Sequence, residues 1–232
     1  MEILPNGITL EIPEGVFPLG TDSMALADFT RLHPGAKVLD LGSGAGTLGL
    51  LLCAAYRDCS VTGLEWEPRA HAAALENIRR NGLGGRLESI CADIRQIPGL
   101  LAPGSFTAVI SNPPYFSGGP ASKAYPLARQ ESLCPLEDWI AGAARALKYG
   151  GDFFMVYRPE GLARVITLAC AHGLEAKRLR LLRHRQGGEI SLILLQLRKG
   201  GKPGLIWEEA ALYGPDGSPS PYYRKIYHLE EA

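Results

Sequence analysis

The sequence predicts an α/β fold in which a doubly wound, mostly parallel sheet ends in an antiparallel hairpin. Short apolar runs alternate with helix-compatible stretches along most of the 232-residue chain, and the first run ends in a turn with three glycines, residues 42–46. The last two runs are joined by a short turn without a helix between them. Because alternating strands and helices need right-handed crossovers, helices are expected on both faces of a parallel sheet.

The strands are expected where short apolar runs stop at turn residues. The first run, Ala36 to Leu41, stops at the glycine turn, and the final pair is separated by Gln186-Gly187-Gly188. In chain order, the expected strands cover residues 36–41, 60–65, 86–92, 106–111, 152–157, 174–182 and 190–197.

The helices are expected where start and stop signals enclose the remaining stretches. Pro68 and Pro135 stand at helix starts, where the missing N–H of proline costs nothing. Gly150-Gly151 and Gly173 stand at helix ends, where glycine suits the C-cap conformation. In chain order, the expected helices cover residues 47–56, 69–80, 135–149 and 159–172.

Residues 1–35 precede the first strand and are interpreted as an extension packed on a single domain of residues 36–232. The extension is expected to contain a short helix that runs to about Arg31. Its candidate N-caps are Thr21, Asp22 and Ser23. Residues 116–133 are rich in Gly, Pro and Ser and too long for an ordinary connection, so they are interpreted as a functional loop.

The composition excludes several classes of protein. Lys and Arg number 24, as do Asp and Glu, and a net charge of zero argues against binding to nucleic acid by bulk charge. The sequence shows neither a signal peptide nor an apolar run of the roughly 18 residues that span a membrane, so we expect a cytoplasmic protein without membrane contact. The five cysteines are scattered without a C-x-x-C pair, so neither disulfides nor a metal site are expected.

A ligand-binding turn is expected where the first strand meets the first helix, because ligands of open α/β sheets bind beyond the carboxyl ends of the strands. Gly42 and Gly44 let the backbone approach a ligand closely, and the following helix offers unpaired N–H groups. Glu65 ends the second strand, where its carboxylate can accept hydrogen bonds from both hydroxyls of a ribose. NAD and S-adenosylmethionine both present such a ribose.

The turn and its flanks resemble the first motif of class I S-adenosylmethionine-dependent methyltransferases. The motif lies at residues 38–46, carries an acid two residues before the first glycine, and lacks the G-x-x-G end of the dinucleotide fingerprint. This resemblance implies a Rossmann-like class I methyltransferase sheet with S-adenosyl-L-methionine as cofactor. It also implies that Asp40 helps to hold the methionine end, that Trp66 flanks the adenine, and that Asp93 meets the adenine amino group.

The most specific motif, Ser111-Asn112-Pro113-Pro114-Tyr115, follows the fourth strand. Its two prolines fix the backbone and hold the carbonyls around Asn112 outward. The Asn112 side-chain oxygen and the Pro113 carbonyl can then accept both hydrogens of a planar NH₂ group and aim its lone pair at a sulfonium methyl. Such positioning lowers the barrier without a metal or a strong base, and Tyr115 can stack on the flat group.

Residues 112–115 resemble the catalytic motif of methyltransferases that act on exocyclic or amide nitrogen. Their targets are N6 of adenine in DNA or RNA, N2 of guanine in RNA, and the glutamine amide of release factors. The glutamine enzymes carry a sizeable helical domain before the first strand, whereas about 35 residues precede it here, and DNA adenine enzymes usually add a recognition domain, for which no insertion here is large enough; both classes are therefore disfavoured. An N5-glutamine protein methyltransferase and a non-catalytic S-adenosylmethionine-binding protein stay open as alternatives.

Nearly the whole chain resembles one family, the bacterial tRNA1(Val) adenine-37 N6-methyltransferases. The segments that carry the resemblance are Phe17 to Phe29, Asn112 to Phe116, Ala128 to Glu131, Tyr157 to Glu160, Lys199 to Gly201 and Tyr222 to Tyr227. The resemblance implies N6-methylation of an adenine in RNA, most simply tRNA. It also implies that the first segment folds over the cofactor, so that Thr21 and Asp22 touch it. Gln130 departs from the family, in which His is common.

Basic residues gather in the last third of the chain. Residues 145–205 contain twelve Lys and Arg and four acidic residues, whereas residues 1–144 contain ten basic and fifteen acidic residues. Phosphate contacts are expected from the densest part, residues 177–185. The residues predicted to bind RNA are Arg178, Arg180, Arg183 and Arg185.

Overall fold

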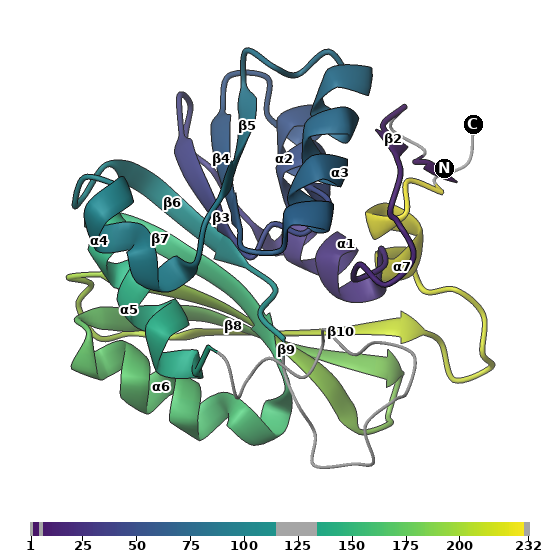
Figure 1. Ribbon diagram of the computed structural model, residues 1–232. Coiled ribbons are helices and arrows are strands. Elements are labelled where there is room, and N and C mark those ends of the chain that lie inside the picture. The colour runs from purple at the N-terminus through teal and green to yellow at the C-terminus, as the bar shows by residue number, and fades with distance from the viewer. Residues whose placement is uncertain (1, 5–6, 115–133, 230–232) are drawn as a thin grey trace.

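The computed structural model of the chain describes residues 2–4, 7–114 and 134–229 (Figure 1). A main sheet forms the middle layer, with helices on both faces. Its strands are β3 (Lys37–Leu41), β4 (Ser60–Glu65), β5 (Leu87–Cys91), β6 (Phe106–Ser111), β7 (Leu147–Tyr157), β8 (Leu174–Arg185), β9 (Ile190–Lys199) and β10 (Ile206–Tyr213). A separate small sheet pairs β1 (Glu2–Ile3) with β2 (Thr9–Leu10).

The strands of the main sheet lie in the order β10-β8-β9-β7-β6-β3-β4-β5. Neighbouring strands run parallel except for the two pairs that include β9. The predicted doubly wound, mostly parallel sheet with a C-terminal antiparallel hairpin is therefore confirmed. One consequence matters for function: the carboxyl ends of every strand but β9 lie along one edge of the sheet.

The helices divide between the two faces of the sheet. They are α1 (Thr21–Phe29), α2 (Thr47–Ala55), α3 (Pro68–Arg80), α4 (Ile97–Leu100), α5 (Leu136–Ala146), α6 (Leu162–Ala171) and α7 (Pro221–Ile226). Helices α1, α2, α3 and α7 cover one face, and α4, α5 and α6 cover the other (Figure 1). Alternate strand residues follow this division, since Phe154 and Val156 join the core beside α1 whereas Phe153 and Met155 join the core beside α5.

The helix predicted for residues 135–149 ends at Ala146, and Lys148 and Tyr149 belong to β7 instead. The register between β6 and β7 shifts at this point, and Gly150 adopts a φ of 78°. Gly150-Gly151 is therefore a bulge inside a strand, and the interpretation of this pair as a helix C-cap was wrong.

The predicted N-caps of the first helix were also wrong. Helix α1 is capped by Gly20 without a side-chain hydrogen bond, and it ends at Phe29 rather than near Arg31. The hydroxyls of Thr21 and Ser23 bond to other partners, Tyr227 and Asn112 respectively. These side chains therefore connect α1 to the rest of the protein instead of capping it.

Candidate active site

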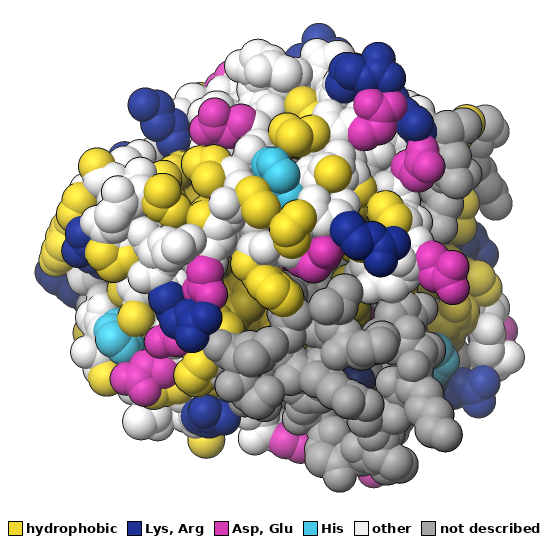
Figure 2. All heavy atoms as spheres, viewed as in Figure 1, with side chains coloured by type: hydrophobic (Ala, Val, Ile, Leu, Met, Phe, Trp, Pro, Cys, Tyr) yellow, Lys and Arg dark blue, Asp and Glu magenta, His cyan; other side chains and the backbone are white. Residues whose placement is uncertain are grey.

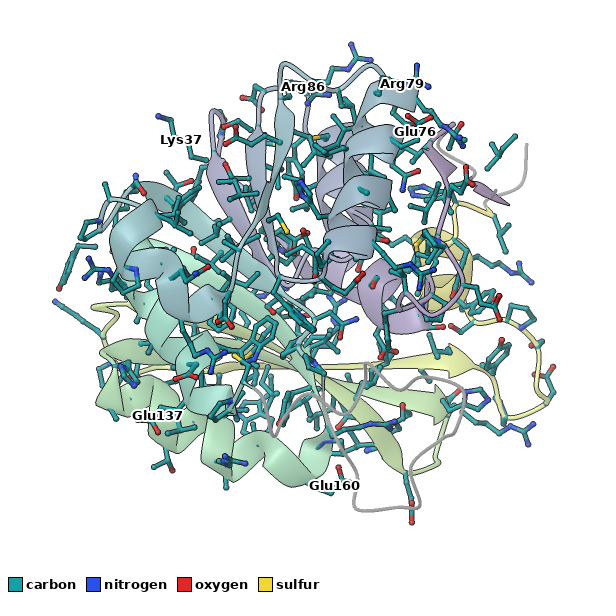
Figure 3. The ribbon with its side chains drawn as sticks, in the orientation of Figure 1. Lys37, Glu76, Arg79, Arg86, Glu137 and Glu160 are labelled. Atoms are coloured by element: carbon teal, nitrogen blue, oxygen red, sulfur yellow. The ribbon has the colours of Figure 1, made fainter. Side chains whose placement is uncertain are left out.

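A cavity of about 350 Å³ opens at the carboxyl ends of β3, β4 and β6, which lie side by side. This volume is within the range of small-ligand pockets. In Figure 3, the labels of Lys37 and Arg86 mark the opposite edge of the sheet, where β3 and β5 begin. The cavity wall includes Val16, Phe17, Ser23, Gly42, Gly44, Glu65, Trp66, Asp93, Asn112, Pro114, Cys134 and Trp139.

The turn after β3 requires glycine at two points. Gly42 and Gly44 have φ values of 68° and 54°, in the left-handed region that other residues rarely adopt. A Cβ on Gly42 would lie 2.5 Å from a ring carbon of Trp139, so this glycine also lets α5 approach the turn. A Cβ on Gly44 would meet nothing within 4 Å, because Gly44 faces open space beside the cavity.

Glu65 is held at the cavity by backbone groups. Its carboxylate accepts hydrogen bonds from the N–H of Gly44 at 2.8 Å and of Glu67 at 2.9 Å, one on each oxygen. Burial raises the pKa of Glu65, and these two hydrogen bonds, together with one from the Trp66 backbone, oppose the rise. Because a carboxylate offers about four acceptor sites, Glu65 keeps acceptor capacity at the cavity, as the ribose interpretation requires.

Trp66 and Asp93 also line the cavity, as the sequence predicted. The Trp66 side chain is partly exposed there and offers a flat apolar wall. Asp93 already accepts two hydrogen bonds from the Arg95 guanidinium, at 2.9 and 2.5 Å, and these hold the pKa of Asp93 below its usual value. Asp93 can thus still accept a hydrogen bond from a ligand, but both of its oxygens already bond to Arg95. The sequence analysis did not predict this ion pair.

The structure does not bring Asp40 to the cavity wall. Its side chain is buried below the glycine turn, and neither carboxylate oxygen has a hydrogen-bond partner among the described residues. Burial and the charge of Glu65 raise the pKa of Asp40 to about 7. The predicted direct contact of Asp40 with the methionine end therefore finds no support in this geometry.

Asn112 lines the cavity at the end of β6, and a hydrogen bond to another side chain fixes the orientation of its amide. The Nδ2 group of Asn112 donates to the Oγ atom of Ser23 at 3.4 Å. Within the described ranges the Oδ1 atom accepts no hydrogen bond, so it is the acceptor that the amide offers at the cavity. The preceding Ser111 donates its hydroxyl to the Leu41 carbonyl at 2.9 Å, which fixes the end of β6 against β3. Ser23 is 89 residues from Asn112, and the sequence analysis did not identify this contact.

The remaining residues of the motif differ in their position relative to the cavity. Pro114 lines the cavity, whereas Pro113 is buried and does not line it. Tyr115, a predicted catalytic residue, and the predicted functional loop at 116–133, with Gln130, lie outside the described residues.

Thr21 and Asp22 do not line the cavity, although Ser23 does. The Thr21 hydroxyl bonds to the Tyr227 hydroxyl at 2.9 Å, and burial raises the pKa of Asp22 against the opposing charge of Arg158. The structure therefore does not bring Thr21 and Asp22, the two residues predicted to touch the cofactor, to the cavity wall.

Two of the four arginines predicted to bind RNA are used inside the protein. Arg178 is 7% exposed and donates to the Phe29 carbonyl, to Gln196 and to Glu208. Arg180 pairs with Asp28 at 3.0 Å and with Glu208 at 2.7 Å. Burial alone would raise the pKa of Glu208, but hydrogen bonds from both arginines lower it. The phosphate contacts predicted for Arg178 and Arg180 are therefore replaced by internal ion pairs.

Arg183 and Arg185, at the end of β8, are differently placed. Arg183 lies 3.7 Å from the exposed Glu209, and Arg185 is exposed. On the face in Figure 2, described Lys and Arg side chains are interspersed with Asp and Glu rather than gathered in one patch. Among the described residues, no group of three His, Cys, Asp or Glu side chains could hold a metal ion, and no helix could span a membrane.

Comparisons with known proteins bear on this site. Residues 19–169 match the methyltransferase small domain family. The chain is 30% identical over 172 residues to a tRNA1(Val) (adenine(37)-N6)-methyltransferase of Bacteroides fragilis, which covers 73% of the chain and 72% of that relative. It is 31% identical over 194 residues to the protein of the same name from Tolumonas auensis, with coverage of 82% and 79%.

Solved structures agree on the fold. A predicted O-methyltransferase from Agrobacterium tumefaciens aligns with a TM-score of 0.75 at 22% identity, covering 91% of this chain and 98% of its own. TrmN from Thermus thermophilus aligns with a TM-score of 0.57 at 22% identity, covering 76% of this chain and 48% of its own.

Proposed function

The chain belongs to the methyltransferase small domain family and to the family of the tRNA1(Val) (adenine(37)-N6)-methyltransferases, and from this premise we propose that it methylates N6 of an adenine in tRNA. It is an S-adenosylmethionine-dependent N-methyltransferase. The observation that carries the proposed chemistry is the orientation of Asn112 at the cavity, where Nδ2 bonds to Ser23 and Oδ1 is the acceptor atom of the amide. Since tRNA is cytoplasmic, we expect the enzyme there.

The cavity suits S-adenosyl-L-methionine. The Glu65 carboxylate lines the cavity and is the proposed acceptor for the ribose hydroxyls, and the space beside Gly44 lets the backbone approach a ligand. Trp66 supplies a wall for the adenine, and Asp93 supplies an acceptor for its amino group. When bound, the cofactor supplies an electrophilic methyl group on its sulfonium.

Asn112 then positions the nucleophile. Its Oδ1 atom accepts one hydrogen of the adenine amino group, and the Pro113 carbonyl is the proposed acceptor for the other. Both acceptors stabilise the positive charge that grows on nitrogen as the new N–C bond forms and the C–S bond breaks. The amino group afterwards loses a proton to solvent. Tyr115 is the proposed stacking partner of the adenine, and Arg183 and Arg185 are proposed phosphate contacts.

Transfer of labelled methyl groups to total tRNA tests the substrate. We expect label in tRNA that ribonuclease releases as N6-methyladenosine, and adenine-37 of tRNA1(Val) is the first position to examine by mass spectrometry. Label that resists ribonuclease but is released by protease would indicate an N5-glutamine protein methyltransferase. Cofactor binding without methyl transfer to either tRNA or protein would indicate a non-catalytic S-adenosylmethionine-binding protein.

Replacement of Asn112 tests the mechanism. The Asn112→Ala variant removes an interaction that strengthens as charge develops, so the single-turnover rate at saturating tRNA should fall by about 10²–10³-fold. Cofactor affinity, measured by calorimetry, should change far less. A wild-type single-turnover rate for this variant would contradict the role given to Asn112.

A further inference from the structure

We propose that a row of aromatic side chains at the edge of the sheet binds the single-stranded RNA that flanks the target adenine. The row consists of His184 from β8, Tyr213 from β10, Tyr223 from α7, and Tyr227, which caps the end of α7. The inference rests on the proposed function, because it takes RNA as the substrate. It deepens that function by naming the surface that holds the RNA.

The four rings form a continuous series. Ring centroids lie 5.0 Å apart between His184 and Tyr213, 5.1 Å between Tyr213 and Tyr223, and 4.5 Å between Tyr223 and Tyr227. His184 is exposed and the three tyrosines are half-buried, so each ring packs on its neighbour and keeps part of its surface in solvent. Because every base has a flat π-face, such rings bind single strands with little dependence on sequence.

One end of the row is joined to the helix that carries Ser23. The Tyr227 hydroxyl bonds to Thr21 at 2.9 Å, and Ser23, two residues further along α1, lines the cavity and bonds to Asn112. Helix α7 lies beside α1 in Figure 1. The row therefore begins within one helical turn of the residue that orients the proposed catalytic amide.

The sheet topology places the far end of the row on the same edge as the cavity. Strands β6, β8 and β10 run in the same direction, so His184 and Tyr213 lie at carboxyl ends, as Asn112 does. Three strand spacings separate β6 from β8, which is about 14 Å. A few nucleotides of single strand can cover this distance.

The charges near the row complement RNA. Arg185, at the end of β8, is exposed and is the register partner of Tyr213 in β10. Arg224 follows Tyr223 and is exposed. Arg183 bonds to the Gly188 carbonyl and lies 3.7 Å from Glu209, but Glu209 and the nearby Asp216 are exposed, so solvent screens their attraction to the arginines. Basic side chains beside aromatic rings are typical of single-strand binding surfaces.

Binding of a fluorescent, unmodified tRNA1(Val) transcript tests the row. The variants Tyr223→Leu and His184→Ala should each raise the Kd for the transcript about tenfold, because they remove a ring on which a base stacks. Tyr223→Phe keeps the ring and should stay within about twofold of wild type. Tyr149→Ala is the matched control, since Tyr149 is 80% exposed near the amino end of β7, and its Kd should not change. Cofactor affinity should be unaffected in all four variants.

The outcomes separate the inference from the proposed function. Wild-type Kd values for Tyr223→Leu and His184→Ala, in an enzyme that methylates tRNA, overturn the inference alone. Failure of the wild-type enzyme to methylate any RNA overturns the proposed function, whatever the binding data show. If Tyr223→Leu does not fold, the exposed His184 decides the question. If only Arg185→Ala weakens binding, with a salt slope reduced by about one, RNA is held by phosphate contacts and the stacking surface is refuted.

Discussion

Two regions of the molecule bury charged side chains, and they use them in opposite ways. At the end of β4, Glu65 is held by backbone N–H groups, among them those of Gly44 and Glu67, which position its charge without neutralising it. On β8, Arg178 and Arg180 form ion pairs with the carboxylates of Glu208 and Asp28, so their charges are neutralised inside the protein. A buried charge that is positioned by backbone groups keeps its capacity for a ligand, whereas one that is neutralised by opposite charges stabilises the fold.

The largest effect on stability is expected from disrupting the buried ion pairs of β8. Arg178→Ala leaves Glu208 with one arginine fewer and the Phe29 carbonyl without this donor, so the free energy of unfolding should fall by about 3–5 kcal/mol in urea titrations. Arg185→Ala, at an exposed site of the same strand, should stay within about 0.5 kcal/mol of wild type. If Arg178→Ala and Arg185→Ala had the same free energy of unfolding, the buried ion pairs of β8 would not stabilise the fold more than an exposed arginine does.

A smaller effect is expected on the Glu65 side. Glu65→Ala removes the proposed acceptor of the ribose hydroxyls, and the loss of hydrogen bonds to a charged group is worth about 1.5–3 kcal/mol. Calorimetry should therefore show at least tenfold weaker cofactor binding. Glu88→Ala removes an exposed carboxylate from the neighbouring strand β5 and serves as the control. Unchanged affinity in Glu65→Ala would rule out the ribose contact.

The smallest effect concerns Asp40, a buried acid without a partner in the described part of the chain. Burial and the charge of Glu65 raise its pKa to about 7 in the folded protein, above the value of about 3.9 for an unfolded chain. The folded state thus retains a proton that the unfolded state releases, and this contribution to stability is lost as pH rises from about 4 to 7.

In the Asp40→Asn variant the side chain at this position cannot titrate, so the variant should not lose this contribution to stability as the pH rises. The stability of the variant relative to wild type should therefore increase as the pH rises from 4 to 8. Urea titrations at several pH values measure this difference. A constant difference across the range would mean that Asp40 is ionised in the folded protein throughout.

The sequence allowed prediction of those parts of the site that depend on the sheet alone. Gly42, Glu65 and Asn112 each follow or end a parallel strand, so their meeting at one edge follows from topology. Contacts between side chains distant in the chain were not predictable. The contact of Ser23 with Asn112, and the fit of Trp139 against Gly42, depend on how helices dock on the sheet.

The local concentration of charge predicted site residues less well than the sequence motifs did. The arginines of residues 177–185 formed one basic cluster in the sequence, but alternate strand residues face opposite sides of the sheet. Arg178 and Arg180 therefore point to α1 and its acids. Strand β10, which supplies Glu208, was not predicted because its adjacent Glu208 and Glu209 interrupt the apolar pattern. Helix α7 was not predicted because it spans only six residues.

The contacts that fix α1 have a consequence for the order in which the protein assembles during synthesis. Phe29 bonds to Arg178, Asp28 to Arg180 and Thr21 to Tyr227, across 149, 152 and 206 residues respectively. Because translation proceeds from the N-terminus, α1 leaves the ribosome long before these three partners do. Helix α1 can pack on α2 and β7 earlier, but its bonds to β8 and to Tyr227 form last. A nascent chain interrupted before β8 would contain the glycine turn, Glu65, Asn112 and Ser23, but it would lack the bonds that fix both ends of α1.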